Sequence, residues 1–565
     1  MEKLLWKESI DEKNISWSVS NFPKDELCWI LSLQENIGDM LFPKVPTVEE
    51  ILNRYPDRPS NLPVTRYAPS PTGFMHIGNF YSAYISERIA HQQWGCFLLR
   101  IEDTDKKREV DSALPLIIST LKKYDLINDE GENQSWLEKG LYGPYRQSER
   151  GIIYKAFVKF LLSRWDAYVC FLTDTEIDEI RTFQEKNKLP IWIYGDFSKW
   201  RNATKQDVFK ELQRGVPYVI RLKSTWLLGK KREIFDGVRG KMNIQENFLD
   251  SVILKQDGLP TYHFAHVVDD HLMKTTHVVR GDERIPSLPL HLQLFEILDR
   301  KPPQYIHIAP IMKAEEGKKR KISKRKDPEA NMDYFSREWY PVEVLKEYLM
   351  WIMDSSYEGW KNQNPTKSVT EYEDFNYKKL NKSWALFDIK KLDSYWKKYF
   401  SQLSLNQFMI LVQEWIKKYE PECYDKIFSD FTFPSQVFGI DLLDGKNLWR
   451  FSKISDIKKM FWFFDFWYEQ KSKMVAEYVK NNKQKLILID GFIDSLDMLN
   501  KDQWRNAFKF KCIEYWFEKE LSSITRWLKM LLIGDEKGPD LYAILKVLGK
   551  TEVIKRLQMI LLLAK

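Results

Sequence analysis

Short, almost continuously apolar runs alternate with amphipathic stretches in the first part of the chain. Residues 96–101 form such a run, and residues 64–68 have the pattern of a short buried strand that contains one charged residue, Arg66. Between them apolar residues recur at three- and four-residue steps from His76 onward. Runs of this length are typical of strands buried in a parallel sheet, and the intervening spacing is typical of a helix. The sequence therefore predicts a β-α-β unit over residues 63–125.

The same alternation returns over residues 251–330, after a segment of mixed character. In this later region we expect strands over 252–254, 276–283 and 305–311 and a helix over 260–270. The mixed segment, 126–250, has a charged helical pattern at 173–188 and a strand pattern at 217–222, which predicts an α+β insertion. From residue 331 to the end, apolar residues keep helical spacing, so we expect stacked helical bundles. Residues 1–62, closed by several prolines, are predicted to form an extension.

Composition narrows the class of protein. At 565 residues the chain is long enough for about three or four domains, and 44% hydrophobic with 30% charged residues is typical of a soluble protein with ordinary cores. The longer apolar runs, at 460–464 and 559–564, are too short to span a bilayer. A net charge of +7 permits a polyanionic partner without requiring one. The five cysteines are widely spaced and odd in number, which predicts a reducing cytoplasm rather than a disulfide framework.

The strand, turn and helix start at residues 64–79 suit a phosphate group. The turn reads Ala-Pro-Ser-Pro-Thr-Gly, and the helix pattern opens at His76. Free N–H groups and the helix dipole favour an anion at such a helix start. An ordinary strand–loop–helix connection is the alternative, but the turn and the ionic residue Arg66 inside the strand favour a binding site. His76 could donate to phosphates, and Gly78 would let a purine approach the backbone closely.

Four consecutive polar residues follow the second apolar run: Glu102, Asp103, Thr104 and Asp105. The carboxyl ends of parallel strands face the crevice in which open α/β sheets bind ligands. A helix cap is the alternative, since Asp and Thr also cap helices. One residue is enough for a cap, so the group favours a ligand site.

A basic loop at residues 318–326 contains seven cationic residues of nine. Alone, it has an equally good explanation as a solvated surface or a localisation signal. Together with the phosphate-binding turn it suggests a different use. A nucleoside triphosphate attacked at its α-phosphate needs its leaving pyrophosphate neutralised, and Lys321 and Lys324 could supply that charge in the transition state.

Taken in order, these motifs resemble those of class I aminoacyl-tRNA synthetases, and more narrowly those of bacterial-type glutamyl-tRNA synthetases. The two signatures are HIGN at 76–79 and KISKR at 321–325. The resemblance is dense over about residues 40–360 and thinner to the end. The other matching stretches are VTRYAPSPTG (64–73), LLRIEDTD (98–105), GPYRQSER (143–150), YVIRLK (218–223), LPTYHFAHVVDDHLM (259–273), THVVRGDE (276–283), KISKRKDP (321–328) and GDEKGPDLYAILKVLG (534–549).

The resemblance implies that ATP activates L-glutamate to glutamyl-adenylate and that the acyl group passes to tRNA(Glu). The glutamate pocket would be lined by Arg66, Ala68, Ser70, Glu102, Tyr262, His266 and Arg280. A side-chain carboxylate needs a planar bidentate cation, for which Arg66 and Arg280 are candidates, and the α-ammonium needs a carboxylate such as Glu102. His266 stands at a variable position of the family, and a structural histidine is as good an interpretation as a substrate contact.

The resemblance also implies an ATP site with Mg²⁺ on the phosphates. Catalytic roles fall to His76, Lys321 and Lys324. The full ATP-binding set is His76, Gly78, Asn79, Glu283, Arg284, Lys321, Ser323 and Lys324. Many relatives have an aromatic residue at the position of Arg284, and we expect its guanidinium to stack on the adenine instead.

Many relatives hold zinc in the insertion, and here the ligand pattern is broken. Cys170 is followed by Phe171 and Leu172, and Trp200 stands where a cysteine could be. Zinc needs about four ligands, so we predict no metal site. Packing of Trp192, Tyr194 and Trp200 is expected to replace the metal.

By resemblance, the fold is a Rossmann-type α/β class I catalytic domain with an α+β insertion, followed by an all-α half. The expected domains are an extension (1–62), a catalytic domain (63–125 and 251–330), an acceptor-end-binding insertion (126–250), a stem-contact helical domain (331–400) and a helical anticodon-binding domain (401–565). The expected partners are L-glutamate and tRNA(Glu), and tRNA(Gln) is left open as a second one. We expect no membrane partner and a monomeric protein.

Two rival functions follow from the same motifs. A glutaminyl-tRNA synthetase shares the catalytic domain, but its C-terminal half is a β-barrel, against the helical pattern here. A non-catalytic tRNA-binding paralogue usually has a broken signature, whereas HIGN and KISKR are intact. A short tRNA-modifying relative lacks the anticodon half, and this chain is too long for it.

Overall fold

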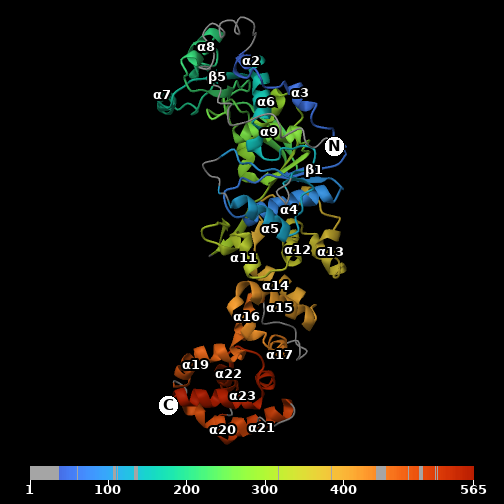
Figure 1. Cartoon of the computed structure of the whole chain (residues 1–565), viewed down its shortest axis with the longest axis vertical. Coiled ribbons are helices and arrows are strands. Elements are labelled where there is room, and N and C mark those ends of the chain that lie inside the picture. Colours follow the sequence, from blue (N-terminus) through green and yellow to red (C-terminus); the bar gives the residue numbers. More distant parts are fainter. Residues whose placement is uncertain are drawn as a thin grey trace. The chain divides into compact units, whose positions relative to one another are not determined.

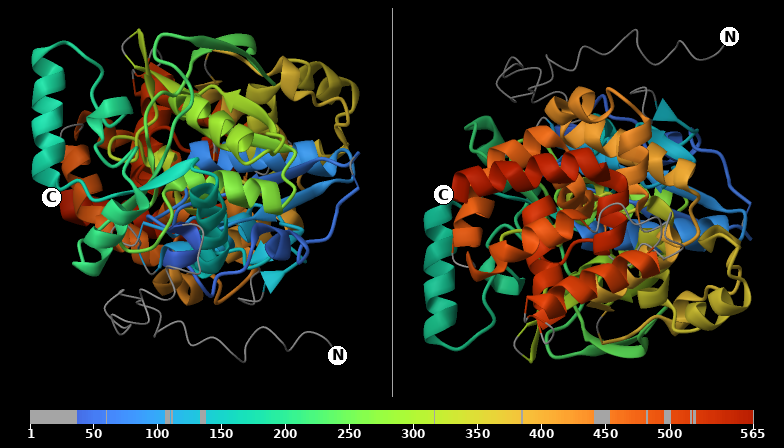
Figure 2. Two further views of the ribbon diagram at one scale, coloured as in Figure 1. Left: turned by 90° about the horizontal axis from the view of Figure 1, so that it is seen from above. Right: turned by 90° about the horizontal axis from the view of Figure 1, so that it is seen from below.

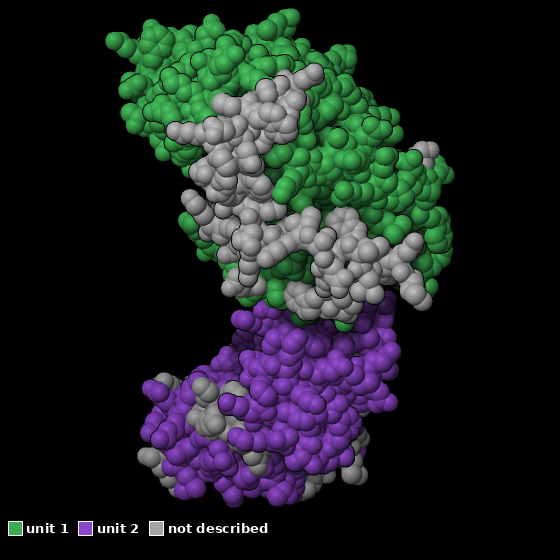
Figure 3. Space-filling model, turned by 45° about the horizontal axis from the view of Figure 1, so that its top comes forward, with its two compact units in different colours: residues 1–332, 351–387 green, residues 333–350, 388–565 purple. Residues whose placement is uncertain are grey.

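The computed structural model describes residues 37–59, 61–105, 110, 112–132, 138–315, 317–383, 385–440, 453–480, 483–494, 501–515, 517 and 520–564. The chain forms two compact units (Figure 1, Figure 3). The first combines Met1–Met332 with Trp351–Phe387, and the second combines Asp333–Met350 with Asp388–Lys565. Of the predicted extension, residues 1–36 lie outside the described ranges.

The first unit contains all the strands among the described residues. They are β1 (Val64–Tyr67), β2 (Cys96–Leu99), β3 (Glu130–Glu132), β4 (Glu138–Lys139), β5 (Ala167–Cys170), β6 (Val219–Leu222), β7 (Lys231–Asp236), β8 (Gly240–Gln245), β9 (Val252–Leu254), β10 (His277–Gly281), β11 (Gln304–Ile308), β12 (Ile311–Glu315), β13 (Lys318–Lys321) and β14 (Ala385–Phe387).

Helices of the first unit lie between and around these strands. They are α2 (Ile37–Leu41), α3 (Val48–Leu52), α4 (Ile77–His91), α5 (Ala113–Lys123), α6 (Gly151–Ser163), α7 (Asp174–Lys186), α8 (Lys205–Gln213), α9 (Tyr262–Leu272), α10 (Leu288–Ile297) and α13 (Tyr357–Gln363), with short 3₁₀ helices η3 (Gln147–Arg150), η4 (Gly195–Phe197), η5 (Asp282–Ser287), η6 (Pro328–Ala330), η7 (Val369–Glu371) and η8 (Tyr377–Lys379).

Two parallel strand pairs form the centre of the first unit. β1 pairs with β2 and β10 pairs with β11, both in parallel. The two pairs meet where the Thr276 N–H donates to the Val64 carbonyl at 2.9 Å and the Val64 N–H donates to the Thr276 hydroxyl at 2.7 Å. The residues of these strands are nearly all buried, as their apolar-rich patterns predicted. The carboxyl ends of β1, β2 and β10 thus face one side of the unit.

The insertion has its own antiparallel sheet of order β5-β6-β9 and a separate hairpin, β7–β8. β9 was expected to belong with the later α/β segment, but it pairs with β6 and so extends the sheet of the insertion. Helix α7 lies at the margin of this unit (Figure 1, Figure 2), and Gln184 is its only buried residue. The charged pattern that predicted α7 reflects this exposure.

Among the described residues of the second unit, the regular elements are all helices. Its elements are α11 (Met332–Arg337), α12 (Val342–Met353), α14 (Ile389–Phe400), α15 (Leu405–Tyr419), α16 (Pro421–Ile427), α17 (Thr432–Phe438), α19 (Asp465–Lys480), α20 (Leu488–Asp494), α21 (Lys501–Glu514), α22 (Leu521–Ile533) and α23 (Leu541–Ala564), with 3₁₀ helices η9 (Ile454–Phe463) and η10 (Lys483–Ile487); α11 and α12 cross the boundary between the units.

Large aromatic side chains fill the core of the second unit. Trp396, Trp415 and Trp527 are among its most buried residues, so these tryptophans stabilise packing. Arg556 is buried with them and donates to the backbone carbonyls of Trp462, Phe463 and Leu532 at 2.7–2.8 Å. Within the described ranges, no helix has both the length and the apolar character that crossing a bilayer requires.

Candidate active site

The HIGN signature forms the junction between the turn after β1 and helix α4. His76 is the N-cap of α4, and its Nδ1 accepts a hydrogen bond from the Gly78 N–H at 2.9 Å. The ring proton therefore lies on Nε2. Burial, helped by Lys324 and Lys321, lowers the pKa of His76, so the ring is neutral near pH 7. A neutral imidazole with a defined tautomer is suited to donating one hydrogen bond.

The KISKR signature lies close to HIGN. The Lys324 ammonium donates to the Phe74 carbonyl at 2.9 Å, and Lys321 pairs with Glu283 at 3.4 Å. His76 lies near enough to both lysines for their charges to lower its pKa. The predicted ATP-binding residues thus come together, although 245 residues separate His76 from Lys321.

The basic stretch differs in form from the predicted loop. Its first half is strand β13, which forms an antiparallel hairpin with β12, and only Ile322 onward turns. Asp327 holds that turn: it accepts two hydrogen bonds from Arg320, at 2.6 and 2.8 Å, and one from the Ser323 N–H at 2.9 Å. The four residues of β13 are all cationic, so they lack the alternation of apolar and polar residues that predicts a strand. This explains why the sequence predicted a loop.

Arg66 and Glu102, both predicted to bind glutamate, belong to one buried ion-pair network. Arg66 donates to Asp270 at 3.2 Å, and Arg100 donates to Asp270 at 2.6 Å and to Glu102 at 3.0 Å. Burial alone raises the pKa of Asp270, but Arg100 and Arg66 outweigh it and lower the pKa. Burial raises the pKa of Glu102 against the same two arginines. The network fixes Arg66 and Glu102 at the carboxyl ends of β1 and β2.

Arg280 has different surroundings from Arg66. Its Nε donates to His307 Nε2 at 2.9 Å, its Nη1 lies 3.0 Å from His291 Nδ1, and its guanidinium stacks 4.6 Å from the Tyr305 ring centroid. Only 7% of its surface is exposed, and no described carboxylate pairs with it directly. Burial lowers its pKa, and its Nη2 has no hydrogen-bond partner among the described residues. A buried cation whose direct partners are neutral is a strong attractor for an anion.

Two aromatic rings of α9 adjoin Arg280. His266 is fully buried; its Nε2 lies 3.2 Å from the Tyr305 hydroxyl, and its ring stacks 4.4 Å from His291. Burial and nearby arginines hold the pKa of His266 well below its usual value. These contacts supply a structural role, and a glutamate contact stays a prediction. Tyr262 packs on the rings of His266 and His291, and the Arg284 guanidinium lies 5.1 Å from the centroid of the Tyr262 ring.

The remaining predicted residues lie in the same region. Ala68 and Ser70 follow β1 directly, and the Glu102 N–H donates to the Pro69 carbonyl at 2.9 Å, which links their turn to the acidic residues after β2. Asn79 lies in the first turn of α4. All the predicted glutamate-binding residues therefore belong to β1, β2, α9, β10 or the segments that follow them.

Several residues of this site were missed by sequence reasoning. They are Arg100, Arg150, Asp236, Asp269, Asp270, His291, Tyr305 and His307, all buried. The available signal for Arg100 was its charge within the apolar run 96–101, directly after β2. The pairing of His307 with Asp236 joins residues 71 apart, for which the sequence carries no signal.

The insertion replaces the expected metal with aromatic packing only in part. Trp200 packs on Phe171 at 4.7 Å, and Tyr194 packs on Phe197 and Phe248 at 5.0 Å. For Trp192 the prediction is wrong, because 66% of its side chain is exposed. In the part of the chain that the structure describes, no three His, Cys, Asp or Glu residues gather as metal ligands. The absence of zinc stays a prediction.

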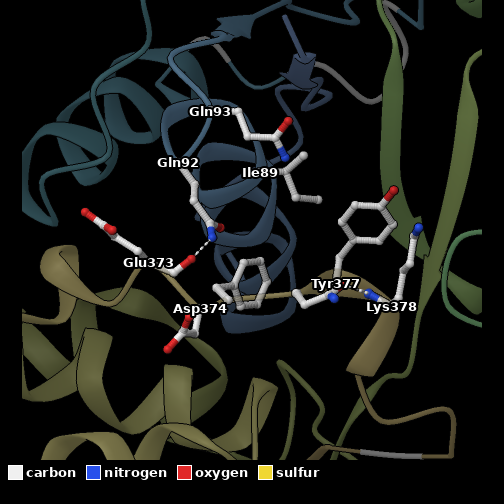
Figure 4. A pocket seen from close by; sticks show the side chains of 9 residues that line it. Ile89, Gln92, Gln93, Glu373, Asp374, Tyr377 and Lys378 are labelled. Atoms are coloured by element: carbon white, nitrogen blue, oxygen red, sulfur yellow. Dashed lines mark hydrogen bonds between the residues drawn. The ribbon is translucent and has the colours of Figure 1, made fainter. Parts of the chain in front are cut away.

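A half-open pocket of about 320 Å³ lies elsewhere in the first unit, between the end of α4 and residues 373–378 (Figure 4). The Gln92 amide donates to the Glu373 carbonyl across it. Its lining includes none of the predicted site residues, so the ligand site described above is separate from it.

Comparison with known proteins agrees with this arrangement. Residues 64–394 match the family described as tRNA synthetases class I (E and Q), catalytic domain, and residues 440–561 match the family described as anticodon binding domain. A glutamate–tRNA ligase of Clostridium perfringens (strain 13) is 38% identical over 544 residues, covering 93% of this chain and 100% of that protein. One of Acetivibrio thermocellus is 35% identical over 550 residues, covering 93% and 100%.

A solved structure is similar as well. A glutamate tRNA ligase from Elizabethkingia meningosepticum, crystallised in complex with its amino acid, has a TM-score of 0.70 and 25% identity, over 89% of this chain and 100% of that chain. The predicted family, fold class and enzyme class are thereby confirmed. The chain belongs to the class I tRNA synthetases of the E and Q group, and within that group to the glutamate–tRNA ligase family.

Proposed function

We propose that this protein uses ATP to join L-glutamate to tRNA(Glu) through a glutamyl-adenylate. The observation that supports the choice of amino acid is Arg280, a buried guanidinium whose direct hydrogen-bond partners are imidazoles. Glutamate would bring the missing carboxylate to it. Glutamine would bring a neutral amide and leave the buried charge unpaired, which favours glutamate strongly.

The neighbouring residues receive the rest of the amino acid. In this proposal Glu102, which Arg100 holds in place, is the counter-charge of the α-ammonium. Arg66, which is held by its ion pair with Asp270, forms part of the pocket. The α-carboxylate is then left to attack the α-phosphate of ATP. Ala68, Ser70, Tyr262 and His266 form the surrounding wall in this proposal. Binding both substrates side by side turns the reaction into an effectively unimolecular step.

The two signatures act on the triphosphate. As the bond between the α- and β-phosphates breaks, negative charge grows on the leaving pyrophosphate, and Lys321 and Lys324 stabilise it. His76 donates a hydrogen bond to the phosphates, and Gly78 and Asn79 lie at the helix start where N–H groups attract an anion. Mg²⁺ would be carried by the phosphates themselves, since this ion usually keeps few protein ligands.

The remaining parts of the proposal concern partners and location. The helices that match an anticodon binding domain would read tRNA(Glu), and the insertion would contact its acceptor end. tRNA(Gln) is a second candidate substrate. We expect a monomer working in the cytoplasm.

The test is aminoacylation of purified tRNA(Glu) and tRNA(Gln) with glutamate and with glutamine, combined with ATP–pyrophosphate exchange with and without tRNA. We expect charging with glutamate only, and exchange that requires tRNA. Arg280→Gln should raise the glutamate KM at least 10-fold, while Arg181→Gln, an exposed arginine of α7, should leave it unchanged. Failure of the wild-type protein to charge either tRNA would overturn the proposal.

A further inference from the structure

Asp236, at the end of β7, contacts two separate parts of the chain through the two oxygens of its carboxylate. Its Oδ1 accepts hydrogen bonds from the Val238 and Arg239 N–H groups, both at 2.9 Å, and so closes its own hairpin. Its Oδ2 lies 2.7 Å from Nδ1 of His307 on β11. Asp236 and His307 are both fully buried. A residue of the insertion thus reaches into the centre of the catalytic region.

The two neighbours of His307 determine where its proton lies. A carboxylate can only accept, so Nδ1 must carry the hydrogen that faces Asp236. A guanidinium can only donate, so Nε2 must present its lone pair to Arg280, whose Nε lies 2.9 Å away. Only one tautomer of the neutral imidazole satisfies both contacts. Burial, and next Arg280, lower the pKa of His307, which keeps the ring in this neutral form.

We propose that Asp236 is a positioning residue for the amino-acid pocket, which fixes His307 so that His307 orients Arg280 for the side-chain carboxylate of the substrate. This inference rests on the proposed function. An aspartate placed directly on Arg280 would occupy the guanidinium. With an imidazole between them, the counter-charge is more distant and Arg280 keeps donors for the ligand.

Other groups near His307 do not replace Asp236. Arg239 pairs with Asp282 at 2.8 Å, and the Tyr305 ring stacks on His307 at 6.0 Å. The Gly237 N–H donates to the Tyr305 carbonyl at 2.8 Å, which fastens the hairpin to β11. Because this backbone contact does not involve the Asp236 side chain, the hairpin retains an anchor when that side chain is changed.

Asp236→Asn is an informative variant because its geometry is constrained. We expect the amide oxygen to replace Oδ1, because Oδ1 accepts two backbone N–H groups at 2.9 Å, whereas Oδ2 accepts one, from His307, at 3.2 Å. The amide NH₂ then faces His307 Nδ1 and favours the opposite tautomer, which points an N–H of His307 at the donor of Arg280. We expect the glutamate KM to rise about 10-fold or more, with kcat and the ATP KM changed less than about 3-fold.

The matched control is Glu233→Gln, on the same strand but in an exposed ion pair with Lys241. It should leave all constants unchanged. His307→Phe removes the acceptor while keeping a ring, and should raise the glutamate KM similarly. The double variant Asp236→Asn/His307→Phe should have a glutamate KM no higher than that of the more impaired single variant, because both changes break the same chain of contacts.

The outcomes separate this inference from the proposed function. If wild type charges tRNA(Glu) and Arg280→Gln raises the glutamate KM while Asp236→Asn does not, the inference is wrong and the proposed function stands. A loss of kcat in Asp236→Asn without a change in the glutamate KM would show that Asp236 only stabilises the hairpin, and would also overturn the inference. Additive effects on the glutamate KM in the double variant would do the same. If wild type fails to charge either tRNA, the proposed function fails first.

Discussion

Asp269 and Asp270 are consecutive residues of α9, yet their carboxylates accept hydrogen bonds from different arginines. Asp270 accepts from Arg100 and Arg66 at the ends of the parallel strands, whereas Asp269 accepts from Arg150 at 2.7 Å. Gln147 and the Tyr154 hydroxyl also donate to Asp269, at 2.8 and 2.9 Å, and Arg100 Nε lies 3.8 Å from its Oδ2. One helix turn therefore positions the proposed glutamate pocket with one side chain and the start of the insertion with the next.

Replacing each aspartate by asparagine should separate these two roles. Either change leaves a buried arginine without its counter-charge, so each should destabilise the first unit by about 3–5 kcal/mol. Asp270→Asn should also raise the glutamate KM, because Arg66 loses its restraint, whereas Asp269→Asn should leave that KM nearly unchanged. Denaturant unfolding and ATP–pyrophosphate exchange measure the two effects. Equal KM values in the two variants would contradict the division of roles.

A second prediction concerns the turn that carries Lys324. Arg320 and the Ser323 N–H both depend on Asp327, whose pKa Arg320 holds well below its usual range. Asp327→Asn should loosen this turn and lower kcat of ATP–pyrophosphate exchange by about 10-fold, with the glutamate KM unchanged. Glu315→Gln is the control, because Glu315 also pairs with Arg320 but lies before the turn. A loss of kcat as large in the control would refute the positioning role.

The pH dependence of stability should show the contribution of His91, at the end of α4. Hydrogen bonds to Asp129 at 2.8 Å and to Glu87 at 2.9 Å raise its pKa to about 9. Because the folded pKa is raised above the unfolded value of about 6.5, the stabilisation is complete below pH 6.5 and is lost as the pH rises through 9. The Tm difference between wild type and His91→Gln should therefore shrink from pH 6 to pH 10. A constant difference over that range would disprove the ion pair.

Local patterns and the two signatures predicted much of the fold and most of the residues that the structure brings together at the candidate site. β1, β2, β10 and β11 are short and rich in apolar residues because both faces of each strand are buried. Arg66 was noticeable in β1 for the same reason, since a charge in a buried strand needs a partner. Likewise, the signature residues His76 and Lys324 were recognisable by type and order, and the structure brings them together.

What the sequence did not predict depends on contacts between distant segments. The partner of His307 is Asp236, in the β7–β8 hairpin, which lies within residues 126–250 of the predicted insertion. β9 has an ordinary strand pattern, and only its antiparallel partner β6 decides which sheet it joins. Trp192 is a large apolar residue of the kind that usually lies in a core, but its backbone has a positive φ of 106° and the residue is 66% exposed. Tertiary pairing, rather than propensity, determines each of these.

The insertion should fold without zinc. Cys170 is buried, Trp200 packs against Phe171, and no second cysteine follows at ligand spacing. We expect elemental analysis of the purified protein to find well below one zinc per chain, and chelator treatment to leave the Tm and the charging rate unchanged. Stoichiometric zinc that survives dialysis would contradict this prediction.

Arg284 provides a test of the nucleotide side of the site. Its guanidinium lies over the Tyr262 ring, and its exposed position in η5 follows Glu283, which pairs with Lys321. We expect the same guanidinium to stack on the adenine of ATP. An exposed cation–π contact contributes about 0.5–1 kcal/mol, so Arg284→Ala should raise the ATP KM about 2- to 5-fold.

Two comparisons separate this stacking from a general loss of charge. Arg284→Trp keeps a stacking surface and should restore the ATP KM, whereas Arg284→Gln should behave like Arg284→Ala. Because Tyr262 also loses its cation in these variants, the glutamate KM must be measured in parallel, and we expect it to change less than the ATP KM. An unchanged ATP KM in Arg284→Ala would show that this residue supports Tyr262 alone and takes no part in binding the nucleotide.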